Sequence, residues 1–286
     1  MKKTIVLIAS IIIGLSTVAC NSKKKEAKTE AQIEKVQNPV VARIAELKKA
    51  GYDIVDYHGH LKGGLTMEDL LKHSKETGID YGVAFNAGVG FPITNDSTLL
   101  ANYEQYKDYP VYMAMQAEGR EWVTMFSKEN IATFDYVFTD AMTWTDKKGR
   151  RMRLWIPEEV FVDDKDDFMD QLVDKIVGVM KNEPIDLYVN STYLPDILQP
   201  EYDALWTDER MQKVIDAAVA NDIAIEINAR YKIPSASFIK KAKAAGAKFS
   251  MGTNNTDKNL GTLDYAIEMI DVCGLEPNDF FKPSKK

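Results

Sequence analysis

Seven short apolar runs, separated by longer amphipathic segments, constrain the fold of this chain more than any other feature of its sequence. Most of the runs are nearly continuous and rich in β-branched and aromatic residues, which is typical of strands buried on both faces of a parallel sheet. Between them lie helical stripes such as Met211, Val214, Ile215, Ala218 and Val219. The predicted strands are Tyr52–His58, Tyr81–Asn86, Val111–Glu118, Phe134–Ala141, Ile185–Asn190, Ile223–Asn228 and Lys248–Asn254.

This alternation predicts an α/β fold, a single distorted seven-stranded β/α barrel of the TIM-like type. A doubly wound open sheet is the alternative, because it is built from the same units. The chain has 286 residues, and no polar Pro/Gly stretch divides the runs. We therefore expect one barrel domain over residues 41–286.

The N-terminus predicts a location. Met1-Lys2-Lys3, the apolar run Ile5–Leu15 and Thr17-Val18-Ala19-Cys20 resemble a bacterial lipoprotein signal over residues 1–19, which would be followed by lipidation of Cys20. An uncleaved membrane anchor is the alternative, but the run is shorter than the ~20 residues that span a bilayer. Residues 20–40 then form a polar tether. We expect an extracytoplasmic protein, periplasmic or at the cell surface, that meets the membrane through its lipid anchor only.

Charge and cysteine content exclude two classes of protein. The formal net charge of −7 makes nucleic acid an unlikely partner, since phosphate contacts need a basic surface. Two cysteines rule out a disulfide scaffold. Cys273 lies near a predicted helix end, where a packed small side chain is expected rather than a nucleophile.

Every predicted strand finishes with a polar or ionisable side chain. In β/α barrels the carboxyl ends of the strands carry the functional site, so this set predicts a site for a metal or a small polar molecule. The alternative is that Asn and Asp simply end strands as turn residues. The residues are His58 and His60, Asn86, Glu118, Asp140, Asn190, Glu226 with Asn228, and Asn254.

The sharpest signal is Asp56-Tyr57-His58-Gly59-His60. Residues i and i+2 of a strand point the same way, so both imidazoles are expected inside the barrel, with Asp56 one step deeper. His58, His60 and Glu118 are the predicted ligands of one divalent ion, at most two, with Zn, Mn and Fe as candidates. For Glu118 an ion pair with Arg120 is the alternative.

Further residues are candidates for chemistry and substrate binding. Asp140 and Glu226 are predicted proton acceptors, and Lys62 or an arginine of residues 150–153 is predicted to stabilise developing negative charge. Arg151 and Arg153 lie beside Trp155 in a long segment after the fourth strand, where salt bridges to Asp163–Asp167 are the alternative to substrate binding. The predicted substrate-binding residues are Asn86, Arg120, Arg151, Arg153, Asn190, Asn228 and Asn254.

The His58-Gly59-His60 element, Glu118, Ile225-Glu226-Ile227-Asn228 and Ser250–Asn255 together resemble the PHP family, the polymerase-and-histidinol-phosphatase type of metal-dependent hydrolase. The resemblance covers about residues 52–283. It implies a distorted seven-stranded barrel, His58 and His60 as the first metal-ligand pair and Glu118 as a bridging carboxylate. Asn86, Asn190 and Asn254-Asn255 stand where the family usually has His or Asp, so a three-metal cluster is not expected.

Two functions follow from these residues. The first is an extracytoplasmic metal-dependent hydrolase that uses a metal-activated water; a phosphoester is the substrate that the resemblance implies. The alternative is a non-catalytic lipoprotein whose asparagine-rich barrel mouth binds a sugar or polyol, because amides both donate and accept hydrogen bonds. Either function needs a small-molecule partner.

Overall fold

The computed structural model of the protein describes residues 39–283. The chain divides into a unit that ends at Arg43 and a unit that begins at Ile44, and the strands belong to the second. The predicted signal and Cys20 lie outside the described residues. The predicted tether overlaps helix α2, Pro39–Lys49, by two residues, Pro39 and Val40. Among the described residues no helix is long and apolar enough to cross a bilayer.

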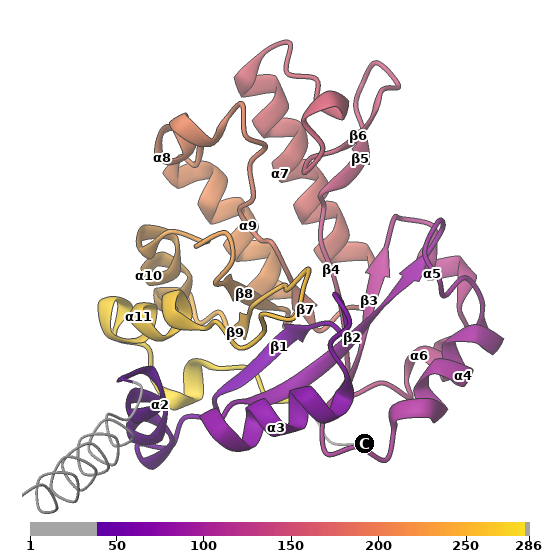
Figure 1. Ribbon diagram of the computed structural model, residues 1–286. Coiled ribbons are helices and arrows are strands. Elements are labelled where there is room, and N and C mark those ends of the chain that lie inside the picture. The colour runs from indigo at the N-terminus through magenta and orange to yellow at the C-terminus, as the bar shows by residue number, and fades with distance from the viewer. Residues whose placement is uncertain (1–38, 284–286) are drawn as a thin grey trace, which may run out of the picture. The chain divides into compact units, whose positions relative to one another are not determined.

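Seven parallel strands close into a barrel in the order β1-β2-β3-β4-β7-β8-β9, as Figure 1 shows. The β/α barrel prediction is therefore confirmed, and the open sheet is excluded because β9 pairs with β1 through Met251 and Asp56. The strands are β1 Val55–Gly59, β2 Asp80–Gly88, β3 Tyr112–Glu118, β4 Tyr136–Thr139, β7 Leu187–Tyr188, β8 Ala224–Asn228 and β9 Phe249–Gly252.

Helices connect the strands, and several begin where the sequence supplies a cap. Thr66 and Asp69 form a capping box at the start of α3, and Gly78 ends that helix in the left-handed conformation with φ 79°. On α9 the predicted stripe is buried at Met211, Val214, Ile215 and Ala218, and the helix contacts α7 and β8, whereas Val219 at the end of the stripe is exposed. The helices are α3 Met67–Thr77, α4 Asp96–Tyr106, α5 Trp122–Met125, α6 Lys128–Ile131, α7 Lys165–Asn182, α8 Tyr202–Leu205, α9 Asp208–Ala220, α10 Ala236–Ala244 and α11 Asp264–Cys273.

The barrel interior holds an apolar cluster below a polar layer. Side chains of the cluster come from six strands or their ends: Val55, Tyr57, Ala84, Ala114, Tyr136, Phe138, Leu187, Val189 and Ala224. Along β8 the next position on the same side as Ala224 is Glu226, and the one after is Asn228; both are buried. The apolar cluster therefore forms the floor on which the polar strand ends lie.

Strand β1 contains a bulge that the sequence pattern does not predict. Asp56 pairs with Tyr81 and Gly59 with Val83, so three steps on β1 match two on β2. As a result Tyr57 packs in the apolar cluster, while His58, the next residue, contacts Phe138 of the same cluster at 4.6 Å between ring centroids. The expectation that Asp56 shares a face with the histidines is wrong. Its carboxylate accepts hydrogen bonds from Thr253 and Gly261 instead.

The long segment after β4 folds into an antiparallel hairpin of β5 Thr143–Thr145 and β6 Arg151–Arg153, followed by a 3₁₀ turn at Pro157–Glu159. Trp144 packs against Phe168 of α7, with ring centroids 5.5 Å apart. This contact fixes the hairpin beside α7, as seen in Figure 1. The hairpin thus forms one wall next to the carboxyl ends of β3 and β4.

Candidate functional site

Amide and carboxylate side chains at the strand ends bond to one another across the barrel mouth. Asn86 of β2 donates from Nδ2 to Glu118 Oε1 of β3 at 2.6 Å. Asn190, after β7, donates to Asp140 Oδ2, after β4, at 2.8 Å. These bonds tie neighbouring strand ends together and fix the orientation of both carboxylates.

Asn190 joins the network from a strained backbone position. Its Oδ1 accepts hydrogen bonds from Nδ2 of Asn228 and of Asn254, each at 3.1 Å. Asn190 and Asn254 have φ values of 50° and 52°, in the left-handed region that asparagine tolerates better than most residues. The backbone of these two asparagines therefore agrees with the turn interpretation, while their side chains also bond to each other within the network.

The network lines a cavity of about 420 Å³, which we call the mouth pocket. Its volume suits a small molecule, and its wall mixes amides, carboxylates, two cations and aromatic rings. Among the lining residues are Lys62, Asn86, Phe91, Gln116, Glu118, Asp140, Met142, Trp155, Asn190, Tyr193, Arg230, Tyr231, Asn254 and Thr256.

His58 is held by Glu226 below this pocket. Its Nδ1 donates to Glu226 Oε1 at 2.6 Å, and both side chains are 1% exposed. Glu226 also accepts from the backbone N–H of Asn190 and from Asn228 Nδ2, at 2.8 and 2.9 Å. Strand β9 closes over the pair at Gly252, where a Cβ atom would lie 2.1 Å from Glu226 Oε1. Glu226 therefore has three donors and is shielded from solvent.

His60 is fixed in the same manner by a backbone carbonyl. Its Nδ1 donates to Ala84 O at 3.0 Å, so the proton lies on Nδ1. Burial, followed by electrostatic interaction with His58 and Lys62, lowers the pKa of His60 well below its usual range. The ring is thus neutral at physiological pH. The Nε2 atoms of His58 and His60 are both buried without a hydrogen-bond partner.

The charges of Glu118 and Lys62 are altered by their surroundings. Burial, reinforced by the charge of Asp140, raises the pKa of Glu118 to about 8, despite the hydrogen bond from Asn86. Burial also lowers the pKa of Lys62, while Glu118 opposes that shift. Glu118 therefore carries a proton at neutral pH and can donate it to a molecule in the mouth pocket.

The predicted metal ligands do not form a complete centre. Glu118 lines the mouth pocket, whereas His58 and His60 do not. Within residues 39–283 no three side chains of His, Cys, Asp or Glu are grouped so that they could hold a metal ion. In both histidines Nδ1 is anchored by a hydrogen bond, and the buried Nε2 atom has no hydrogen-bond partner. A metal-bound imidazole is usually held in this way, with the lone pair of the second nitrogen directed to the metal. Glu226 accepts from His58 Nδ1 and Glu118 lines the mouth pocket, so within residues 39–283 neither carboxylate is grouped with the two Nε2 atoms as a third ligand.

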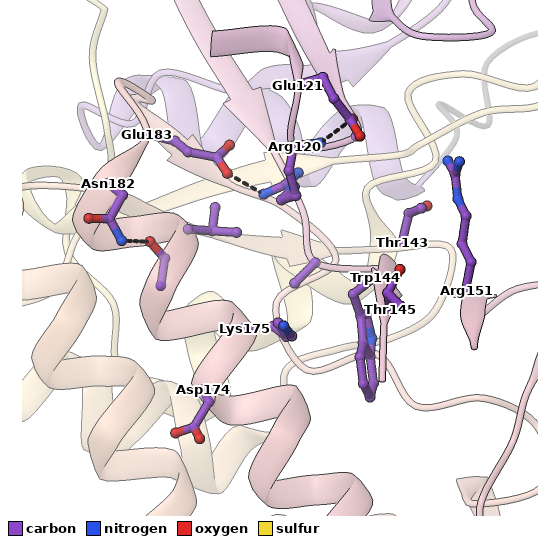
Figure 2. Close-up of a pocket in the computed structure, with 14 residues that line it drawn as sticks. Arg120, Glu121, Thr143, Trp144, Thr145, Arg151, Asp174, Lys175, Asn182 and Glu183 are labelled. Atoms are coloured by element: carbon purple, nitrogen blue, oxygen red, sulfur yellow. Dashed lines mark hydrogen bonds and ion pairs between the residues drawn. The ribbon is translucent and has the colours of Figure 1, made fainter. Parts of the chain in front are cut away.

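The predicted arginines have different surroundings. Arg120 pairs with Glu183 at 2.7 Å and donates to Thr139 Oγ1 and Asp140 O, so the pair with Glu118 is not formed; Figure 2 shows the contact with Glu183. Arg153 pairs with Glu159. Arg151 lines two cavities outside the mouth pocket.

The salt-bridge alternative holds for Arg150, the neighbour of these arginines. Its guanidinium pairs with both Asp146 and Asp163. Asp163 belongs to the acidic segment Asp163–Asp167, which is the salt-bridge partner that the alternative predicts. Arg150 is therefore part of the structure of the hairpin rather than of the mouth pocket.

Gln116, Tyr193, Arg230 and Tyr231 are among the lining residues that the sequence analysis does not predict. Gln116 is on the same side of β3 as Glu118, two residues before it, so strand periodicity could have indicated it. Tyr193 and Tyr231 meet edge to face with centroids 4.8 Å apart. They follow β7 and β8, and the pairing of these two strands brings their loops together.

Comparisons with known proteins give no family. No protein-family model matches the chain, and no curated protein matches it. Among solved structures it resembles a magnesium-complexed protein of the mandelate racemase/muconate-lactonizing enzyme type from Roseovarius nubinhibens, with 7% identity and a TM-score of 0.34. The match covers 71% of this chain and 54% of that one. A Xaa-Pro dipeptidase with bound methionine gives 13% identity and a TM-score of 0.20, over 72% of this chain and 41% of the other. At these scores neither likeness bears on activity.

Proposed function

We propose that the protein binds a small sugar or polyol in the mouth pocket. The observation that carries this proposal is the network of amides and carboxylates, Asn86–Glu118 and Asn190–Asp140, tied across four strand ends and lining one cavity. Hydroxyl groups both donate and accept hydrogen bonds, and so do amides and a protonated carboxyl group. The wall can therefore donate to a ligand hydroxyl or accept from it.

Aromatic rings support the same ligand class. Trp155 lines the mouth pocket and is 41% exposed, which leaves part of its ring open to a ligand. Tyr193 and Tyr231 line the pocket on other loops. Sugars offer apolar C–H faces as well as hydroxyl edges, so a pocket with aromatic walls and fixed polar groups can match both.

The test is calorimetric titration of the full chain with a panel of single sugars and polyols. We expect at least one to bind, and Asn86→Ala to weaken its binding about tenfold or more, because the change leaves Glu118 without its donor. Asn259→Ala, at an exposed asparagine of the loop after β9, is the matched control and leaves binding unchanged. A panel without any bound sugar or polyol would contradict the proposal.

Hydrolysis that depends on a metal is the second candidate function. It is favoured by the two buried Nε2 atoms of His58 and His60, whose Nδ1 atoms are already anchored by Glu226 and by Ala84 O. We propose no ion-dependent step, since residues 39–283 contain no group of three His, Cys, Asp or Glu side chains that could hold a metal ion. The candidate rests on this anchoring and on the resemblance to the PHP family.

Metal analysis of the full chain, purified without chelator, tests the second candidate. Bound Zn, Mn or Fe that is lost in the His58→Ala/His60→Ala double variant would support it, and hydrolysis of chromogenic phosphate, ester or glycoside substrates would then identify the bond. Metal-free protein whose melting temperature is the same with Zn, Mn and EDTA would leave only the binding function.

We further propose that Cys20 carries a lipid that anchors the protein outside the cytoplasm. The sequence of the leader supports this, and the barrel needs no membrane contact of its own for the proposed binding. Cys20→Ser should release the protein from the membrane fraction of a bacterial host. Equal membrane association of the variant and the parent would count against the anchor.

A further inference from the structure

Two more cavities extend from the mouth pocket, the first next to it and the second next to the first. The first, of about 680 Å³, shares Phe91, Glu118 and Trp155 with the mouth pocket, and we call it the rim pocket. The second, of about 550 Å³, shares Thr143 and Arg151 with the rim pocket and is drawn in Figure 2; we call it the hairpin pocket. Because each cavity shares lining residues with the next, the three lie in a row from the barrel mouth, past the β5–β6 hairpin, to α7, and we call this row the groove.

From this row of neighbouring cavities we infer that the natural ligand is an oligosaccharide, with one end in the mouth pocket and the rest of its chain along the groove. The inference rests on the proposed sugar-binding function and extends it from a single sugar to a chain. A single small ligand would fill only the first of the three cavities.

The junction of the first two cavities has the chemistry for a sugar chain. Trp155 lines both the mouth and the rim pockets and is 41% exposed, so its ring can stack on a unit that passes from one to the other. Phe91 lines both as well. An exposed tryptophan in a groove is costly unless something covers it, and C–H faces of a sugar are suitable cover.

Charge in the hairpin pocket favours a neutral chain over a polyanion. Arg120, Arg151 and Lys175 line it together with Glu121, Asp174 and Glu183 (Figure 2). Opposite charges in equal number give no net field to attract a nucleic acid or an acidic polymer. They do offer donors and acceptors along the whole wall, as a polyhydroxylated chain requires.

The far end of the groove is kept open by a glycine. Gly178 lies within the 18-residue helix α7 and lines the hairpin pocket, yet a Cβ atom added there would meet nothing within 4 Å. Glycine inside a helix costs roughly 0.5–1 kcal/mol relative to alanine, and packing does not require it here. The missing side chain leaves space in the pocket for a ligand.

The experiment compares ligand lengths. The full chain is titrated with glucose and N-acetylglucosamine, and with their linear β-1,4 oligomers of about four and six units. We expect affinity to rise about tenfold or more from the single sugar to the longest oligomer, in the range that one good stacking contact provides. Trp155→Ala should remove most of this gain. Gly178→Leu, which fills the hairpin pocket, should weaken the longest oligomer alone and leave the single sugar unchanged.

The outcomes separate the two proposals. If single sugars bind and length adds nothing, the groove is not a chain-binding site, while the mouth-pocket function stands. If neither single sugars nor oligomers bind, both proposals fail, and extended peptides become the class to examine in the groove. Far-UV circular dichroism melting of Gly178→Leu shows whether the variant is folded; leucine is a good helix former, so we expect an intact α7.

Discussion

His58 Nδ1 lies 2.6 Å from Glu226 Oε1, and this buried pair joins β1 to β8, the two strands on either side of β9. Glu226 has three donors in all, two of them from Asn190 and Asn228 on the polar layer above the apolar floor. The carboxylate therefore organises the site from below. It holds one imidazole and the backbone from which the asparagine network begins.

Glu226→Gln should lower the free energy of unfolding by about 2–3 kcal/mol, because the amide replaces a charged acceptor and brings an NH₂ group toward existing donors. Urea unfolding followed by circular dichroism measures the change. Glu268→Gln, on the exposed side of α11, is the control and should remain within about 0.5 kcal/mol of the parent. Equal stability of both variants would show that the buried carboxylate contributes little.

Asp56 gives the second prediction, since its carboxylate fixes the bulged strand. It accepts from Thr253 N and Oγ1, at 2.9 and 2.5 Å, and from the N–H groups of His58 and Gly261. Asp56→Ala leaves these donors unpaired in a fully buried place, so we expect a loss of about 3 kcal/mol or more in unfolding free energy.

Asp53→Ala is the matched control for Asp56→Ala. Asp53 pairs with Lys282 at 2.7 Å, and both side chains are more than half exposed. Such surface pairs contribute about 0–1 kcal/mol. Thermal melts of the two variants should therefore differ clearly. A loss at Asp53 as large as that at Asp56 would contradict the role given to the buried carboxylate.

Asp56 also shows which parts of the fold could be predicted from the sequence and which could not. The apolar runs predict all seven strands and the barrel because burial on both faces leaves a strong local pattern. The bulge at Asp56 does not follow from that pattern, because it depends on how β1 aligns with β2 and on donors almost two hundred residues away at Thr253.

The candidate site was predicted in position but only partly in arrangement. Strand ends meet at one mouth, so Asn86, Glu118, Asp140 and Asn190 do line one pocket. The rule that strand ends carry the site does not predict how deeply each side chain is buried, however. His58 and His60 are buried and do not line the mouth pocket, although His60 lines a neighbouring cavity. Arg120 pairs with Glu183, a residue at the end of α7 with no signal in the sequence.

Glu118 predicts a pH dependence of stability. Its pKa rises from the usual 4.5 to about 8 on folding, through burial and then the charge of Asp140. Between these values the folded protein holds a proton that the unfolded chain releases, so the free energy of unfolding falls as pH rises. As the pH rises from about 5 to 8, the free energy of unfolding should therefore fall less for Glu118→Gln than for the parent. Parallel stability curves for the two proteins would contradict this.

A pair of glycines in regular elements should respond to alanine in opposite directions. A Cβ atom at Gly82, on β2, would lie 1.8 Å from the Tyr136 hydroxyl oxygen, which donates to Tyr57 O at 2.6 Å. Gly82→Ala therefore forces Tyr136 out of the apolar floor and should destabilise the protein by about 1–3 kcal/mol or more. Gly178→Ala meets nothing and should stabilise it by about 0.4–1 kcal/mol. Chemical unfolding of both variants measures the two signs, and a stabilised Gly82→Ala would mean that the floor is not packed as tightly as this contact requires.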